Sequence, residues 1–315
     1  MTAQEPTEAA SGSPAVSVVL TTFNRSALLL PAIDSVLQQT LGDFELIVVD
    51  DCSTDDTAEV VGGIHDPRVS LVRHETNLGL AEARNSGISR ARGRYLCFLD
   101  DDDEWRDDKL AAQVAAFEAA ADPADVLVYS QARVDDGVSS DVRPLRGPKP
   151  REPIAEYLMC GEGVITPSSV MLPRVSAGGA LFDPGQRRFE DYTLYLRLEQ
   201  RGFRFVLVEQ PLVTWHVDIT RPRLSRTVGR QEATEWLDSW ESRITPRARR
   251  AFLAREVAPF LPAKGNRWWI LRTICDAVFS GSISLQEGLK SLLKALLPPS
   301  AVLRLRRLLP RSRFG

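Results

Sequence analysis

The apolar positions in the first half of the chain predict buried strands that alternate with helices. Four short runs are rich in β-branched and aromatic residues, as is typical of strands covered on both faces, and they span 16–22, 44–49, 69–73 and 95–99. Segments with helical periodicity separate them, at 26–39, 53–61 and 80–91. Strands joined by helices favour right-handed crossovers, so the pattern predicts a mainly parallel sheet flanked by helices.

Residues at the predicted helix starts support this order. Ser26 is placed to cap the first helix, and Pro31 comes early enough in it to be a first-turn residue or a bend. Ser53 and Asp56 have the spacing of a capping box for the second helix, and a pair of glycines then closes that helix.

The second half of the chain is less regular. It predicts helices at 109–121 and 191–201, strands at 124–130, 164–173 and 203–208, and a mobile loop at 135–150. Beyond about residue 220 only helices are predicted, at 231–243, 246–256, 267–279 and 285–297. We therefore predict three parts: a disordered tail over 1–14, an α/β domain over 15–220, and a helical extension with a basic tail over 221–315.

The composition is that of an ordinary globular protein. With 315 residues, 43% of them hydrophobic, the chain can bury a sizeable core without disulfides. No two of the four cysteines form a CxxC pair, and Cys97 lies in an apolar run, which suits reduced cysteines in the cytosol. The chain start lacks the features of a signal peptide, and no run approaches the ~20 apolar residues of a membrane span. We therefore expect a cytoplasmic protein.

Four carboxylates directly follow the strand predicted at 95–99, and they are Asp100, Asp101, Asp102 and Asp103. Most acidic runs are solvated turns. This run, however, stands at the carboxyl end of an apolar strand, where open α/β sheets bind ligands. Adjacent carboxylates repel one another unless a cation or a proton lies between them, and oxygen ligands suit Mg²⁺ or Mn²⁺. The run therefore indicates a metal site, with a solvated turn as the alternative.

A second acidic pair, Asp50 and Asp51, follows another buried strand. The pair has a simpler interpretation as a turn that leads into the next helix. The carboxyl ends of parallel strands share one edge of a sheet, however, so both acidic groups should lie at that edge. One group would then be available for a nucleobase N–H while the other holds a metal ion.

Four segments of the chain resemble the family-two inverting glycosyltransferases of the GT-A fold. They read VSVVLTTFNR, ELIVVDDCSTDDT, NLGLAEARNSGISRARGRYLCFLDDDDEW and FDPGQRRFEDYTLYLRLEQRG. They occur in the family's order and at its spacings, and together they cover roughly residues 15–220. The resemblance implies a GT-A fold and the transfer of a sugar from a nucleotide-sugar donor onto an acceptor hydroxyl.

The resemblance also implies which residues bind the donor nucleotide. One loop near the nucleotide consists of Thr22, Phe23, Asn24 and Arg25. Asp51, with Asp50 beside it, would accept the N3–H of the base, which favours uracil, although guanine and thymine also carry N–H groups. Arg84 and Asn85 match the ARN element of the nucleotide side, and a helix face packed on the sheet is the alternative for them.

The family's DxD motif falls on Asp100 and Asp102. It implies that Asp102 is the principal ligand of a Mn²⁺ or Mg²⁺ ion and that Asp100 lies near the ribose. Asp101 has the variable place on the nucleotide side, and Asp103 the fourth, frequently acidic position. His216 matches a histidine that can approach the diphosphate or the metal, and a strand-end histidine with a single hydrogen bond is the alternative.

The family's ED motif falls on Glu190 and Asp191, which implies that Asp191 is the general base. A carboxylate near a helix start is positioned by the backbone, but the helix field lowers its pKa and weakens it as a base unless the site is desolvated. A plain charged residue at a helix N-terminus is the alternative. Upstream, the stretch GGALFDP around Phe182 and Asp183 resembles the acceptor-side GGFDE, with two intervening residues.

Together these residues predict an inverting, metal-dependent glycosyltransferase. Its donor would be a UDP-sugar, its acceptor a carbohydrate or a lipid-linked intermediate, and its pathway the synthesis of a cell-envelope polysaccharide or a glycolipid. One alternative is a non-catalytic nucleotide-sugar binding or assembly protein. Another is a metal-dependent nucleotidyltransferase, which typically needs a glycine-rich phosphate loop after the first strand, and VSVVLTTFNRS contains no glycine.

The end of the chain is strongly basic. Residues 288–315 carry a charge of +7, whereas the rest of the chain carries −10. Leucine pairs at 292–293 and 296–297 predict one apolar stripe. The pattern favours either a segment that lies on the anionic inner face of a membrane or a terminal helix packed on the catalytic domain. No aromatic platform or known motif accompanies the charges, so nucleic acid is not expected as a partner.

Overall fold

The computed structural model describes residues 12–120, 124–161, 163–177, 180–217 and 229–297. The chain forms two compact units. The first unit consists of Met1–Ala132, Thr166–Leu194 and Gln200–Trp215, and the second of Arg133–Ile165, Tyr195–Glu199 and His216–Gly315. The helices expected beyond residue 220 therefore share a unit with residues 133–165. Most of the predicted disordered tail, and residues 298–315 of the basic tail, lie outside the described residues.

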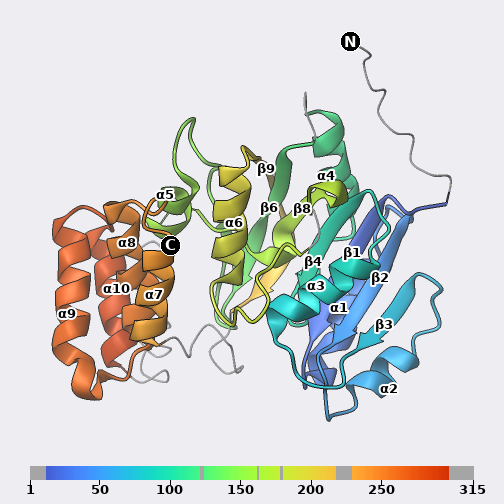
Figure 1. Ribbon diagram of the computed structural model, residues 1–315, viewed down its shortest axis with the longest axis horizontal. Coiled ribbons are helices and arrows are strands. Elements are labelled where there is room, and N and C mark those ends of the chain that lie inside the picture. Colours follow the sequence, from blue (N-terminus) through green and yellow to red (C-terminus); the bar gives the residue numbers. More distant parts are fainter. Residues whose placement is uncertain (1–11, 121–123, 162, 178–179, 218–228, 298–315) are drawn as a thin grey trace. The chain divides into compact units, whose positions relative to one another are not determined.

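The first unit is built on a sheet with the strand order β3-β2-β1-β4-β8-β6-β9-β5 (Figure 1). Its parallel strands are β1 (Val16–Thr22), β2 (Phe44–Asp50), β3 (Val69–Arg73) and β4 (Tyr95–Asp100). Antiparallel strands extend it beyond β4, and these are β8 (Val170–Pro173), β6 (Val126–Asp135), β9 (Arg204–His216) and β5 (Glu104–Trp105). The α/β fold class predicted from the apolar pattern is confirmed.

Helices cover both faces of the parallel strands, which is why every residue of β1 is buried. They are α1 (Ser26–Leu37), α2 (Thr57–Gly62), α3 (Leu80–Arg90) and α4 (Lys109–Glu118). On one face Val18 belongs to a core cluster that includes Ile33 of α1 and Leu110 of α4. On the other face Gly87 of α3 lies against Val19, so closely that a Cβ atom at Gly87 would collide with the valine side chain.

The second unit is mainly helical. Its elements are β7 (Ser140–Arg143), α5 (Ile154–Met159), α7 (Arg230–Ser239), α8 (Pro246–Phe252), η4 (Leu253–Val257), η5 (Ala258–Phe260), α9 (Ala263–Phe279) and α10 (Leu285–Leu296). The helix α6 (Glu190–Gln200) contributes residues to both units. The core of the helical part contains Phe252, Val257 and Ile270, which are fully buried. Within the part of the chain that the structure describes, no helix is long and apolar enough to span a membrane.

Two predictions about the loops are wrong. Ser53 does not cap the helix after it, since its hydroxyl accepts a hydrogen bond from the backbone N–H of Asn24 at 2.8 Å. Asp55 instead accepts the N–H of Thr57, where α2 begins. The segment 135–150 is not one loop, because it contains β7, which pairs with β6.

Several predicted boundaries also differ from the structure. The strand expected at 164–173 is limited to β8, because residues 167–169 form the 3₁₀ turn η1 (Pro167–Ser169). The strand expected at 203–208 continues to residue 216 as β9. The helix expected at 246–256 ends at residue 252, where wider π-helical turns follow in η4.

Candidate functional site

The predicted acidic groups lie at one edge of the sheet, at the carboxyl ends of its parallel strands. The register of β1 places Thr22 beside Asp50 of β2, and Thr21 beside Asp100 of β4. The run from Asp100 to Asp103 turns away from the sheet directly after β4. The two acidic groups thus lie at the same edge of the sheet, one on each side of β1, as the sequence predicted.

Arg25 neutralises part of the acidic run. Its Nη1 atom lies 2.9 Å from an oxygen of Asp101 and 3.1 Å from an oxygen of Asp102. The hydroxyl of Thr22 donates a second hydrogen bond to Asp101, at 2.8 Å. Burial raises the pKa of Asp101 to about 6, and the charge of Arg25 opposes this rise. Three predicted donor-side residues therefore form one hydrogen-bonded group.

Asp103 belongs to a buried structural network behind the DxD turn. The hydroxyl of Ser168 donates to Asp103 at 2.6 Å and accepts the backbone N–H of Asp100 at 3.1 Å. The carbonyl of Ser168 accepts the indole N–H of Trp105 at 2.8 Å. This network fixes both ends of the acidic turn. Sequence analysis did not single out Ser168, because no motif marks a serine that approaches from a distant segment.

Arg84 connects the end of β4 with the start of α6. Its side chain is fully buried, and it forms ion pairs with Asp100 at 2.8 Å and with Glu190 at 3.1 Å. The guanidinium also lies over the ring of Phe182, 5.3 Å from its centre. One arginine therefore holds two carboxylates that are distant in sequence, and its own buried charge is paired.

Asp191 lies next to this ion-pair group at the start of α6. Its pKa is raised to about 7, first by burial and then by the charge of Glu190. The backbone N–H of Tyr192, which donates to Asp191 at 2.8 Å, and the charge of Arg84 both oppose this rise. Desolvation thus outweighs the stabilisation that a helix start gives a carboxylate, and Asp191 has the pKa of an effective base near neutral pH.

Asp51 is held by the loop that precedes α3. Its carboxylate accepts the backbone N–H groups of Leu78 and Gly79, each at 2.8 Å. The ring Nδ1 of His74 lies 2.7 Å from the same carboxylate. Glycine suits this loop because Gly79 has a φ of 91°, in the left-handed region. The structure thus gives Asp51 a fixed orientation, and His74 is a partner that sequence analysis missed.

Asn24 of the predicted nucleotide loop and the neighbouring Asp50 are also anchored. Asn24 has a φ of 53° and accepts the N–H of Thr54 at 2.7 Å. Asp50 is fully buried, accepts the N–H of Ser53 at 2.8 Å and pairs with Arg73 at 3.3 Å. Phe23, by contrast, is exposed. Asp50 therefore supports the turn after β2.

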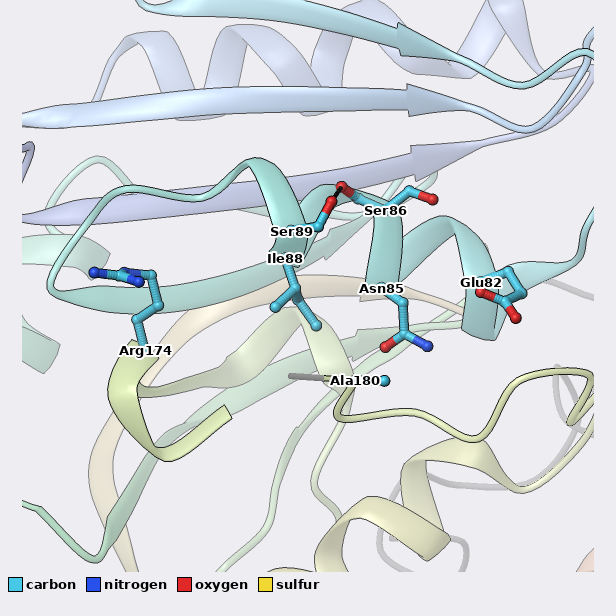
Figure 2. Close-up of a pocket in the computed structure, with 7 residues that line it drawn as sticks. All are labelled: Glu82, Asn85, Ser86, Ile88, Ser89, Arg174 and Ala180. Atoms are coloured by element: carbon cyan, nitrogen blue, oxygen red, sulfur yellow. Dashed lines mark hydrogen bonds between the residues drawn. The ribbon is translucent and has the colours of Figure 1, made fainter. Parts of the chain in front are cut away.

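Asn85 fixes the backbone of the acceptor-side stretch. Its amide donates to the carbonyl of Phe182 at 2.8 Å and accepts the N–H of the same residue at 3.1 Å. Asn85 also lines a cavity of about 480 Å³ along the outer side of α3, which Figure 2 shows together with the lining residues Glu82, Ser86, Ile88, Ser89, Arg174 and Ala180. The cavity does not contain the carboxylates of the sheet edge.

The described residues could hold a divalent metal ion only together with ligands from outside the chain. They contain no group of three or more His, Cys, Asp or Glu side chains that could hold an ion alone. Asp100 and Asp102 nevertheless stand on the same turn, and Mg²⁺ is commonly bound through one or two carboxylates plus substrate phosphates. His216 is the last residue of β9 and belongs to the second unit.

Comparisons with known proteins agree with this fold. The chain superimposes on the Staphylococcus aureus protein TarS, solved with UDP-GlcNAc, with a TM-score of 0.62 and 15% identity over 89% of this chain and 88% of that one. It also superimposes on the mannosyltransferase PcManGT of Pyrobaculum calidifontis, solved with GDP-Man and Mn²⁺, with a TM-score of 0.52 and 20% identity over 97% and 84% of the two chains. The fold is that of the GT-A glycosyltransferases.

Sequence similarity narrows the class. Residues 17–177 match the family described as glycosyl transferase family 2. The chain is 37% identical over 245 residues to the amylovoran biosynthesis glycosyltransferase AmsB of Erwinia amylovora, which covers 73% of this chain and 79% of that one. The chain therefore belongs to glycosyl transferase family 2, and it is a glycosyltransferase.

Proposed function

We propose that this glycosyltransferase moves a sugar from a nucleoside diphosphate sugar to an acceptor hydroxyl with inversion at the anomeric carbon. The observation that carries the proposal is that Arg84 forms two ion pairs, one with Asp100 and one with Glu190. These ion pairs join the donor-side motif to the carboxylate group that includes Asp191. Because one buried arginine links the proposed donor site to the carboxylates beside the proposed base, the arrangement suits a single displacement between two bound substrates.

In this proposal Asp191 removes the proton of the acceptor hydroxyl. The freed oxygen attacks the anomeric carbon, and the bond from that carbon to the diphosphate oxygen breaks on the opposite side. The nucleoside diphosphate leaves with the bonding electrons, so one displacement inverts the configuration. The raised pKa of Asp191 supports its role, because a base is most effective when its pKa lies near the working pH.

The acidic turn is the proposed metal site, with Asp102 as the principal ligand and Asp100 beside it. A bound Mn²⁺ or Mg²⁺ would neutralise charge on the leaving diphosphate. Arg25 pairs with Asp102, so the chain itself supplies a positive charge beside the proposed metal ligand. His216 stays a candidate ligand on the strength of the family resemblance.

Uridine is the nucleoside we propose for the donor. Asp51 is oriented by His74 and two backbone amides, and its carboxylate is the proposed acceptor of the base N3–H. The TarS structure with UDP-GlcNAc supports uracil. The complex of the Pyrobaculum enzyme with GDP-Man makes guanine the alternative.

We further propose that the acceptor is a carbohydrate or lipid-linked intermediate of a cell-envelope polysaccharide or glycolipid. The name of the Erwinia relative, which refers to amylovoran biosynthesis, supports a polysaccharide. The basic segment 288–315 supports an enzyme that works in the cytoplasm on the inner face of the membrane.

The test is transfer by the Asp191→Asn variant. Nucleotide sugars are supplied with Mn²⁺ and an acceptor extract, and the anomeric configuration of the product is read by NMR. The wild-type enzyme should invert it, and the variant should lose transfer by at least about a thousandfold while it still binds the donor. Wild-type rates in the variant would show that another group is the base. A wild-type chain that binds nucleotide but never turns it over would favour a binding protein.

A further inference from the structure

Five large apolar side chains of the second unit are exposed on two consecutive helices. Trp268 and Phe279 belong to α9, and their side chains are 84% and 89% exposed. Leu285, Leu289 and Leu296 of α10 are exposed as well. We call these five residues the apolar surface. Isolated exposed leucines are common, but an exposed group that includes a tryptophan and a phenylalanine indicates an interaction site.

The helix α10 departs from the usual pattern of a surface helix in a soluble protein, in which the large apolar side chains are buried. Its two buried residues are the small Gly288 and Ser291, whereas its leucines are partly or fully exposed. The reason is close packing, since a Cβ atom at Gly288 would collide with Val278 of α9. The sequence therefore uses its small residues for the contact between helices and leaves the leucine stripe for something outside the unit.

Helix α9 also divides its apolar residues between two faces. Ile270, Ile274 and Ala277 are buried in the unit. Trp268 and Phe279 are eleven residues apart, which is close to three turns, so they lie on one exposed face of the helix. Arg272 is exposed on that same face, one turn after Trp268.

The two exposed faces adjoin at the turn between the helices. Phe279 ends α9 and Leu285 begins α10, and the turn between them is closed by hydrogen bonds from the N–H groups of Ser282 and Ile283 to the carbonyl of Ala277. A capping box between Ser284 and Glu287 starts α10. Figure 1 shows the two helices side by side, and they are in contact along their length.

The charges around the apolar surface are mainly positive. In the described part of this region, residues 263–297, five residues are basic and two are acidic. One of the two acids, Glu287, is already used by the capping box and lies 3.6 Å from Arg255. Exposed cations beside exposed aromatic and leucine side chains are the features of a helix that lies in the interface of an anionic membrane. A protein partner of neutral or basic surface would not fit these charges.

We propose that the apolar surface, with the cations beside it, docks the second unit on an anionic lipid bilayer. The inference adds α9 and the first turn of α10 to the contact, which the basic segment 288–315 alone did not include. It rests on the proposed function only in the expectation that the acceptor is lipid-linked.

The test measures the partition of the full-length chain onto vesicles of phosphatidylcholine with 30% phosphatidylglycerol. The double variant Trp268→Ala, Phe279→Ala should bind about tenfold or more weakly, because it loses two interfacial aromatic anchors. The matched control is the double variant Leu145→Ala, Val175→Ala, which removes two apolar side chains that are equally exposed elsewhere and should bind as the wild type does. Binding should also fall when phosphatidylglycerol is left out.

Three results would overturn the inference. They are no wild-type binding to the anionic vesicles, equal binding by the Trp268→Ala, Phe279→Ala variant, and a wild-type dimer that this variant dissociates, which would show that a second copy covers the surface. Unchanged thermal unfolding of the variant excludes misfolding as the cause of lost binding. Turnover by the wild-type chain with a water-soluble acceptor is measured in parallel, and turnover without vesicle binding would contradict the docking surface while leaving the proposed function intact.

Discussion

At the scale of single residues, the site depends on a few buried charges that neutralise one another. Arg84 is the central one, since it is fully buried and paired with Asp100 and Glu190. A cation in that position stabilises the protein only while both carboxylates stay in place, because each group would be costly to bury alone. The same arginine moderates the pKa of Asp191. Stability and catalysis therefore depend on the same side chain.

We expect Arg84→Met to lower the free energy of unfolding by about 3 kcal/mol, because two carboxylates lose their buried partner. Arg92→Met is the matched control. Arg92 pairs with Glu45 at 2.9 Å, but its side chain is mostly exposed, so its loss should cost less than about 1 kcal/mol. Urea unfolding measures both variants. Equal losses would show that burial does not distinguish the two ion pairs.

The proposed base predicts a specific pH dependence. Because the pKa of Asp191 is raised to about 7, kcat/KM should increase about tenfold per pH unit below pH 7 and level off above it. In Glu190→Gln a neighbouring negative charge is absent, so the lower limb of the profile should move to lower pH. A pH–rate profile of both enzymes measures the shift. A shift to higher pH would contradict the conclusion that the charge of Glu190 raises the pKa of Asp191.

Lys109 predicts a pH dependence of stability rather than of catalysis. Its buried ammonium lies 3.8 Å from the ring centre of Trp105 and donates to Gln113 at 2.6 Å, and burial lowers its pKa to about 8. The unfolded chain, with an ordinary lysine pKa near 10.4, holds this proton at higher pH than the folded chain. The free energy of unfolding should therefore rise between about pH 8 and pH 10 relative to Lys109→Met. Parallel curves for the two proteins would contradict the lowered pKa.

At the scale of elements, the packing of α3 on β1 positions Arg84 and Asn85. The contact is made by Gly87, where there is no room for a Cβ atom beside Val19. The sheet edge and the helix are thus held at a fixed separation, with Arg84 directed to the core. Three residues within about one turn of the helix therefore have separate tasks: charge pairing, backbone support and close packing.

Gly87→Ala should lower the free energy of unfolding by about 1–3 kcal/mol, because overpacking outweighs the better helix propensity of alanine. Gly62→Ala is the matched control, since Gly62 is also helical and a Cβ atom there would meet nothing within 4 Å. That variant should be neutral or slightly stabilising. Denaturant unfolding compares them, and a stabilised Gly87→Ala would show that α3 can move away from β1.

At the scale of the whole molecule, the metal and the nucleotide should stabilise the fold together. The wild-type chain is heated with UDP, GDP, dTDP or CDP, each with Mn²⁺ or with EDTA. A ligand at about a hundred times its Kd raises stability by about 2.7 kcal/mol. We expect a rise with UDP and Mn²⁺ that EDTA removes and that Asp102→Ala lacks. An equal rise in that variant would contradict Asp102 as the metal ligand.

Much of this molecule was predictable from local pattern. The strands β1, β2 and β4 are mostly apolar runs, so their burial and parallel order follow from the pattern of the sequence. Since the acidic residues directly follow these strands, their meeting at one edge follows as well. The predicted capping box at Ser53 failed because its hydroxyl bonds to Asn24, a partner that no local pattern reveals.

The sequence by itself determined the order of the elements, the edge of the sheet where the carboxylates gather and the basic character of the chain end. Only the tertiary structure decided how those carboxylates are paired and what their pKa values are. Local periodicity records which side of an element is buried, whereas pairing and desolvation depend on neighbours that come from distant segments. Three features therefore depended on the tertiary structure. They are the position of Arg84 between Asp100 and Glu190, the contact of Ser168 with the acidic turn, and the outward leucines of α10.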